Sequence, residues 1–251
     1  MKISLKACRI FTILLSTILF FNLFVSNYFN KYKTIFAVFL IIYWLSFRLF
    51  VKPKENKSSN KKYVSLWLII LGIIFLLIFY IMGMLSSINV SEGFYKNPIN
   101  FVFNPMWRWM FPHVIIIIYS ELMRTLVIDQ NDKKSTICMT IALILVDVII
   151  SINIYNYSSI EGILEIIGCL LISSISLNLL CNYISKRYGS GPNILFKLIT
   201  IIIYNYFMPV LSDIYPIFES LIKLLYPFII YLVIDYLFVN NNKEVLVKNN
   251  N

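Results

Sequence analysis

Eight stretches of almost continuous apolar residues constrain this chain more than any other feature of its sequence. A helix of about 20 apolar residues crosses a bilayer core of roughly 30 Å, and it satisfies its own backbone amides where no water is present. The stretches lack the two-residue alternation of membrane β-strands. The sequence therefore predicts an all-α fold, a polytopic transmembrane bundle of about eight helices. The predicted spans are residues 10–28, 34–51, 63–85, 106–128, 137–157, 162–182, 195–211 and 218–239.

Three of these spans carry residues that are unusual in lipid. The second span contains Arg48, and the short seventh span contains Pro209. The fourth span contains His113 and several charged side chains, so we expect it to be partly interfacial or shielded by neighbouring helices. A count of seven spans therefore remains an alternative. The first span follows a basic segment but precedes no small-residue cleavage site, and we interpret it as an uncleaved helix.

Composition supports the membrane assignment. Apolar residues make up 59% of the 251 residues, charged residues make up 14%, and the mean hydropathy is +0.79. Soluble domains are nearer half apolar and a quarter charged, so a disordered chain, a disulfide scaffold and an ordinary soluble enzyme are excluded. The formal net charge of +10 would suggest nucleic-acid binding in a soluble protein. In a membrane protein its meaning depends on where the positive side chains lie.

The positive side chains predict the orientation of the chain, because lysine and arginine are retained on the cytoplasmic side of a membrane. With a cytoplasmic N-terminus and eight spans, fourteen of the seventeen positive side chains in loops and tails fall on the cytoplasmic side and three on the other side, while the other five lie within spans. Both termini are then cytoplasmic. We expect these charges to contact the anionic inner leaflet of a bacterial cytoplasmic membrane. We do not expect them to bind nucleic acid. The fourteen are Lys2, Lys6, Arg9, Lys52, Lys54, Lys57, Lys61, Lys62, Lys133, Lys134, Lys186, Arg187, Lys243 and Lys248, and the three are Lys31, Lys33 and Lys96.

One membrane domain accounts for nearly the whole chain. Residues 1–239 form the predicted multi-pass transmembrane domain, and residues 240–251 form a polar cytoplasmic tail that we expect to be disordered. The cysteines show no Cys-x-x-Cys spacing, so we interpret them as small apolar side chains. A single histidine excludes a two-histidine zinc helix, and we expect no metal and no cofactor. The cysteines are Cys8, Cys138, Cys169 and Cys181, and the histidine is His113.

Five polar residues inside the apolar spans form the candidate site: Glu121, Arg124, Asp147, Asn178 and Asp235. An ionisable side chain at the centre of a bilayer costs roughly 3 kcal/mol or more, so each one needs an explanation. One interpretation is a proton or cation pathway through Asp147, Glu121 and Arg124. The other, which we favour, is structural. Glu121 and Arg124 pair at i and i+3, while Asp147 is neutral or pairs with Arg124 across the bundle.

The order of features from residue 97 to about residue 235 resembles the long N-terminal membrane region of type I signal peptidases from low-GC bacteria. The segments that carry the resemblance are ELMRTLVI (121–128), IALILVD (141–147), SISLN (174–178), YGSGP (188–192), MPVLSDIYP (208–216) and LLYPFII (224–230). In such proteins an extracytoplasmic serine peptidase domain follows the membrane region. This sequence contains no Ser-Met dipeptide of the family's nucleophile box and stops at Asn251. The resemblance therefore implies a membrane module without its peptidase domain and without a catalytic residue. Such a module is a truncated product, a split partner of a peptidase or a free-standing relative.

Two functions from different classes follow. The resemblance implies a non-catalytic module that assists protein secretion or signal peptide processing, with a peptidase subunit or the translocon as its partner. The charges inside the spans imply instead a small-solute or ion transporter that uses Asp147 and the Glu121/Arg124 pair. The sequence shows no two-fold repeat with broken helices, a pattern typical of many transporters. It also lacks the motifs of intramembrane proteases, which leaves a third class, the membrane enzyme, with little support.

Overall fold

The structure is a computed structural model that describes residues 33–50, 60–85, 110–128, 132–151, 160–207 and 216–240. Its elements are helices, and no strand occurs in these ranges, so the predicted all-α class is confirmed. Segments labelled η are π-helical, and η3 and η4 continue α9 and α11 without a break. The elements are α3 (Lys33–Phe50), α4 (Lys61–Leu85), α7 (Phe111–Ile128), α8 (Lys133–Ser151), α9 (Ile160–Glu165), η3 (Ile166–Ile172), α10 (Ser173–Tyr188), α11 (Ser190–Lys197), η4 (Leu198–Phe207), α12 (Pro216–Asp235) and η5 (Tyr236–Asn240).

Four helical segments of the described chain are long and apolar enough to cross a membrane. They are Lys61–Gly83, Phe111–Ile128, Ile166–Tyr188 and Phe218–Phe238, and they match the third, fourth, sixth and eighth predicted spans. The second, fifth and seventh predicted spans fall mainly on α3, α8 and the run of α11 and η4. The first predicted span and nearly all of the polar tail lie outside the described residues. The total of about eight spans and the orientation of the termini stay predictions.

The molecule places apolar side chains on its surface and charged side chains in its interior. Leu66 and Leu77 of α4 and Phe228 of α12 are exposed, whereas Glu121 and Arg124 of α7 are almost completely buried. Soluble proteins rarely bury unpaired charges and rarely expose continuous apolar faces. An apolar exterior is favourable against lipid, so this arrangement indicates a membrane protein.

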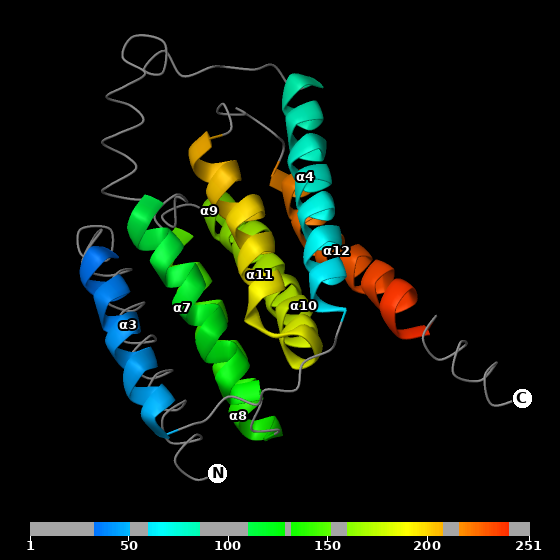
Figure 1. Ribbon diagram of the computed structural model, residues 1–251. Coiled ribbons are helices and arrows are strands. Elements are labelled where there is room, and N and C mark those ends of the chain that lie inside the picture. The colour runs from blue at the N-terminus through cyan, green and yellow to red at the C-terminus, as the bar shows by residue number, and fades with distance from the viewer. Residues whose placement is uncertain are drawn as a thin grey trace, which may run out of the picture.

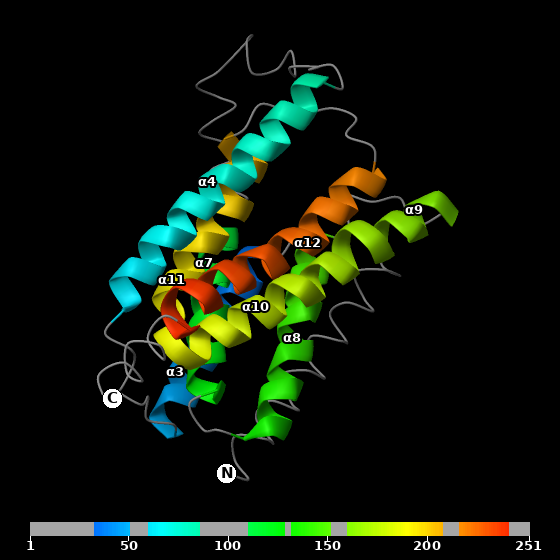
Figure 2. The same ribbon diagram turned by 90° about the vertical axis from the view of Figure 1, so that its right-hand side faces the viewer.

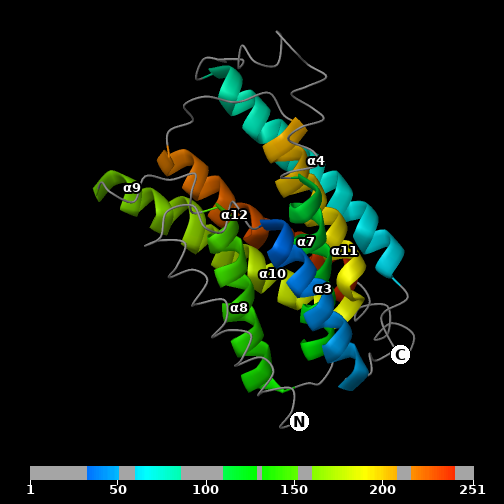
Figure 3. The same cartoon turned by 90° about the vertical axis from the view of Figure 1, so that its left-hand side faces the viewer.

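The helices form two packed groups, and α10 and α11 of the second group contact helices of the first. In the first group, α3 and α8 pack against α7 around Leu40, Val127 and Leu143. In the second group, α4 and α12 pack with α10 and α11 around Phe79 and Ile230, among other residues. Figure 1 shows α3 and α7 on one side, α4 on the other, and α10 and α11 between them. The second group faces the viewer in Figure 2 and the first group in Figure 3.

A glycine turn joins α10 to α11 and reverses the chain. Gly189 has a φ of 86°, a region that favours glycine, and its N–H donates to the Ser185 carbonyl at 3.2 Å. Pro192 lies in the first turn of α11, where its missing N–H costs no helical hydrogen bond. The Asn193 side chain then donates to the Ser185 hydroxyl at 2.8 Å. The turn therefore sets the first residues of α11 against the C-terminal part of α10.

Asp132 caps the N-terminus of α8, outside the predicted span. Its Oδ2 accepts the Ser135 hydroxyl at 2.5 Å and the Ser135 backbone N–H at 3.3 Å. These hydrogen bonds hold the pKa of Asp132 below its ordinary value, and the bond from the Ser135 hydroxyl has the largest effect. The carboxylate also lies at the positive end of the helix dipole. The start of α8 is therefore fixed by a side chain that works best when it is ionised.

The helix ends that the predicted topology makes cytoplasmic all lie at one end of the bundle. The C-terminal ends of α3, α7, α10 and α12 and the N-terminal ends of α4, α8 and α11 point the same way, downward in Figure 1. Contact between the starts of α4 and α11 supports this, since a Cβ added at Gly191 would lie 3.3 Å from Lys61 Cε. These ends carry Lys61, Lys62, Lys133, Lys134, Lys186 and Arg187. Most of the positive charge at the helix ends is thus gathered at one end of the described bundle, whereas Lys33 begins α3 at the other end.

Candidate functional site

Glu121 and Arg124 form the centre of a buried charge network. They lie one turn apart on α7, and Arg124 Nε donates to Glu121 Oε2 at 2.9 Å while Nη2 donates to Oε1 at 3.2 Å. The exposed fractions are 0% for Glu121 and 1% for Arg124, so neither charge reaches the surface of the bundle. The pairing expected from their i,i+3 spacing is therefore present, and it is bidentate, the strongest geometry for this pair.

Two asparagines of α10 complete the hydrogen bonding of Arg124. Arg124 Nη1 donates to the Asn178 backbone carbonyl at 3.1 Å and to Asn182 Oδ1, and Nη2 donates to Asn178 Oδ1. Together with the two bonds to Glu121, all five N–H donors of the guanidinium have acceptors. Asn182 Nδ2 in turn donates to the Thr140 hydroxyl of α8 at 2.7 Å. One side chain of α7 thus connects α7 to α10 directly and to α8 through Asn182.

Lys197 of α11 supplies the second cation of the network. Its Nζ lies 2.9 Å from Glu121 Oε1 and 3.9 Å from Asp147 Oδ1, and its side chain is 2% exposed. Asn193, one turn earlier on α11, donates from Nδ2 to Glu121 Oε2 at 3.1 Å. Glu121 therefore accepts from Arg124, Lys197 and Asn193, and it is the anion that both cations share.

Asp147 of α8 lies at the edge of the network. Its Oδ2 accepts Asn178 Nδ2 at 2.7 Å and the Ser174 hydroxyl at 3.0 Å. The expected direct pairing with Arg124 is not found among the described contacts, because Asn178 lies between the two side chains and bonds to both. Among the described residues, the cation that pairs with Asp147 is Lys197. Two carboxylates and two cations make the network formally neutral.

The predicted site has to be corrected at Asp235, because the described contacts of this side chain are with residues outside the buried network. The Tyr183 hydroxyl donates to Asp235 Oδ1 at 2.5 Å, and Arg187 Nη1 lies 3.7 Å from the same oxygen. Tyr183 and Arg187 follow Asn178 by five and nine residues, which places them about 140° and about 180° around α10. Asp235 of α12 therefore meets the opposite face of α10, whereas Asn178 faces α7 and α8.

Sequence reasoning missed Lys197 and Asn193. Lys197 lies near the predicted cytoplasmic end of the seventh span, where a long basic side chain commonly reaches the membrane interface. A count of the positive and negative charges inside the spans could have identified Lys197. Glu121 and Asp147 carry two negative charges against one on Arg124, and a lysine in another span is the missing partner of such a set.

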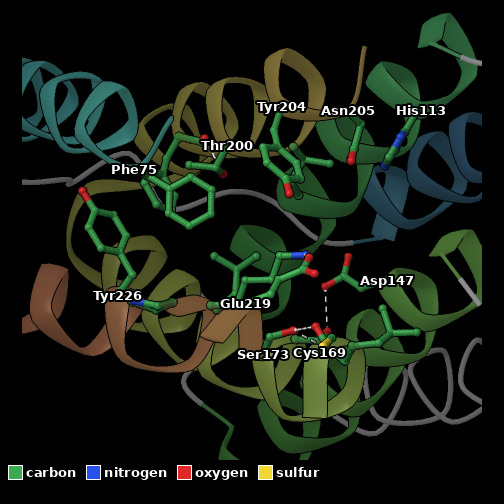
Figure 4. Close-up of a pocket in the computed structure, with 17 residues that line it drawn as sticks. Phe75, His113, Asp147, Cys169, Ser173, Thr200, Tyr204, Asn205, Glu219 and Tyr226 are labelled. Atoms are coloured by element: carbon green, nitrogen blue, oxygen red, sulfur yellow. Dashed lines mark hydrogen bonds and ion pairs between the residues drawn. The ribbon is translucent and has the colours of Figure 1, made fainter. Parts of the chain in front are cut away.

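A cavity of about 360 Å³ adjoins the network on the side of Asp147. In Figure 4, Thr200, Tyr204 and Asn205 of η4 lie on one side of it, and residues of η3, α10 and α12 lie on the other. Asp147 lies at one end, and Phe75 of α4 lies toward the opposite end. The volume falls in the range of small-molecule sites. The cavity is thus a space of ligand size with one carboxylate of the network in its wall.

The remaining residues considered for chemistry occupy separate places. His113 is buried, lines the cavity, and its Nδ1 lies 3.3 Å from the Tyr206 hydroxyl. Cys138, Cys169 and Cys181 form no disulfide within the described residues, and Cys8 lies outside them. Across the described part of the chain, no group of three or more His, Cys, Asp and Glu side chains is placed to hold a metal.

No protein-family model, curated protein or solved structure matches the chain. A helical membrane bundle hosts many unrelated activities, so the network and the cavity are the features that bear on function.

Proposed function

We propose that the chain is a helical module of the bacterial cytoplasmic membrane that assists protein secretion or signal peptide processing and catalyses no reaction itself. One observation carries the proposal. Segments that resemble the membrane region of signal peptidases meet in the buried network: Glu121 and Arg124 come from the first, Asp147 ends the second, and Asn178 ends the third. The resemblance thus rests on residues that contact one another, in addition to apolar composition.

The chemistry of the network favours a scaffold over a reaction centre. The donors of Arg124 all have acceptors, and Glu121 is held by three donors. A buried pair that is neutral and fully hydrogen-bonded fixes the positions of its helices, whereas a reacting group must be able to change its partners or its protonation. A fixed bundle can present the apolar faces of α4 and α12 to a peptidase subunit or to the translocon, through the kind of packing that membrane helices use.

The test is depletion of the protein in its host, followed by pulse-chase labelling of secreted proteins. We expect precursors with uncleaved signal peptides to accumulate and the wild-type chain to restore their processing. Photo-crosslinking residues at the exposed positions Leu66 and Phe228 should capture a peptidase or translocon subunit, while one at the buried position Val127 should not. Unchanged processing after depletion, with no such crosslink, would contradict the proposal.

The second candidate function is small-solute or ion transport, which the contact of Asp147 with the cavity favours. The Asp147 side chain is 23% exposed, the largest fraction in the four-charge network. The test is uptake into liposomes that contain the purified protein, under an imposed pH or ion gradient. Transport should be lost in Asp147→Asn and kept in the matched variant Asp235→Asn. Folded protein that moves no solute would exclude this function without affecting the secretory one.

A further inference from the structure

We propose that the cavity beside Asp147 binds a small organic ammonium ion with an apolar body. The carboxylate of Asp147 would hold the ammonium group, and the aromatic end of the cavity would hold the body. Binding is measured directly in the test below, so this site does not depend on the secretory role proposed above.

The other charges of the cavity wall cancel and leave Asp147 in excess. Lys223 and Glu219 are one turn apart on α12 and form an ion pair with each other. Asp147 is therefore the carboxylate of the wall whose cation partner, Lys197, lies behind the wall in the neutral network, so this end of the cavity is locally negative and a monovalent cation is the complementary ligand there.

Asp147 is only partly compensated from within the network. Lys197 Nζ lies 1.0 Å closer to Glu121 than to Asp147, at 2.9 Å against 3.9 Å. The donors to Asp147 Oδ2 are neutral, an amide and a hydroxyl. Within the described residues, Asp147 Oδ1 contacts Lys197 Nζ, and this distance is longer than a hydrogen bond. An ammonium N–H or N–CH₃ group in the cavity would complete the surroundings of this oxygen.

The wall away from Asp147 is aromatic. The Phe75 ring lies 5.2 Å from the Tyr226 ring and 6.4 Å from the Tyr204 ring, centroid to centroid. Aromatic faces attract organic cations and also pack against apolar groups. The Tyr204 ring already has an ammonium group near it, since Lys223 Nζ lies 5.6 Å from its centroid. A cavity of about 360 Å³ with this wall suits an organic cation better than a bare metal ion, which needs several oxygen ligands.

The probe is benzyltrimethylammonium, and the competitor is neopentylbenzene, which has the same shape without the charge. Full-length protein in dodecyl maltoside, a detergent with no charge and no amine, is dialysed to equilibrium against the labelled probe. We expect saturable binding with one site per chain. Asp147→Asn should weaken it about tenfold or more, the effect of losing one charge-assisted contact. The matched acid variant Asp235→Asn should bind as the wild type does, and neopentylbenzene should compete about tenfold less well than unlabelled probe.

A second variant tests the cavity without touching the network. The Ser173 hydroxyl lines the cavity and bonds to the Cys169 and Leu170 carbonyls of its own helix, so Ser173→Leu fills space and removes no contact with Asp147. The matched control is Ser65→Leu, because Ser65 makes the same kind of bond to the Lys61 carbonyl and does not line the cavity. Ser173→Leu should lose binding and Ser65→Leu should keep it, both with wild-type thermal unfolding. Absent saturable binding, or equal binding by wild type, Asp147→Asn and Ser173→Leu, would overturn the proposal.

Competition with lipids identifies the source of the ammonium group. Displacement of the probe by phosphatidylethanolamine and not by phosphatidylglycerol would assign the site to a lipid headgroup. Displacement by neither lipid would assign it to a soluble amine. Equal displacement by both would mean that acyl chains occupy the cavity without regard to the ammonium group, and it would contradict the proposal.

Discussion

Arg124 is held by a number of contacts that lysine cannot reproduce. Its five N–H donors reach Glu121, Asn178 and Asn182, whereas lysine has three donors on one nitrogen. We expect Arg124→Lys to lose at least two buried hydrogen bonds and to lower the free energy of unfolding by about 2 kcal/mol or more. Steric-trapping measurements of unfolding in bicelles can test this. Arg187→Lys is the control, because Arg187 is partly exposed and its pair with Asp235 is long. Equal stability of Arg124→Lys and wild type would contradict the expectation.

Asp132 gives the fold a defined response to acid. Its pKa is lowered in the folded protein by the Ser135 hydroxyl and backbone N–H, so its ionised form stabilises α8 above the ordinary aspartate pKa. That stabilisation is fully present near neutral pH and is lost as the pH falls through the lowered pKa. Asp132→Asn keeps a capping oxygen but does not titrate. Between about pH 5 and about pH 3, the melting temperature of the wild type should therefore fall more steeply than that of Asp132→Asn. Parallel curves would contradict this.

Individual site residues were predictable where their type conflicts with their surroundings. Glu121, Arg124, Asp147 and Asn178 stand out because each interrupts an apolar run, and the structure brings all four together. Asp235 interrupts an apolar run just as clearly, yet it meets another face of α10. The type of a residue shows that a partner is needed, but the identity of the partner depends on how neighbouring helices are rotated, which packing decides.

At the level of elements, α7, α8, α10 and α11 each contribute a charged or amide side chain to one neutral set. Glu121→Gln leaves two cations against Asp147, and Lys197→Met leaves two carboxylates against Arg124. Breaking such a buried pair from one side costs about 3–5 kcal/mol. The double variant restores neutrality, so we expect it to be more stable than the sum of the single effects predicts, by about 1 kcal/mol or more. The double-variant cycle is measured by unfolding in the same bicelles.

The matched control for that cycle is the pair Glu219 and Lys223 on α12. This pair has the same charges, but its side chains are 22% and 23% exposed, and both come from one helix. We expect Glu219→Gln and Lys223→Met to cost about 1 kcal/mol or less each and to show little coupling. Coupling as large as that of the Glu121 and Lys197 pair would mean that charge alone, and not burial among four helices, causes the effect.

The existence of most helices was predictable, whereas their ends and internal form were not. Long apolar runs fixed α4, α7 and α12 closely, because length and hydropathy suffice for a span. The seventh predicted span starts at residue 195, but α11 already begins at Ser190. Its first turn is polar, and it is helical because Gly189 allows the reversal and Asn193 bonds to α10. An average of hydropathy along the sequence does not detect the first turn of a helix when that turn is polar and is held by hydrogen bonds.

At the scale of the whole molecule, the fold brings to one end the helix ends that the charge pattern assigns to one side of the membrane. Ends of helices from α3 to α12 that carry Lys61, Lys133 and Lys186 lie together, at the lower end in Figure 1. Helices that alternate in direction would gather their positive ends in this way if the membrane retained lysine and arginine on one side. The structure supplies the common end, and the charges predict that this end is cytoplasmic.

Cysteine labelling in intact cells decides between the two orientations. In a variant without the four native cysteines, single cysteines replace Asn60 and Lys134 at the lysine-rich end and Ile160 and Phe218 at the opposite end. We expect a membrane-impermeant maleimide to label positions 160 and 218 in intact cells, and positions 60 and 134 only after lysis, because the anionic inner leaflet retains the positive end. The reverse pattern would invert the topology and place the lysines outside. If all four positions were labelled in intact cells, these helices would not form one bundle across the membrane.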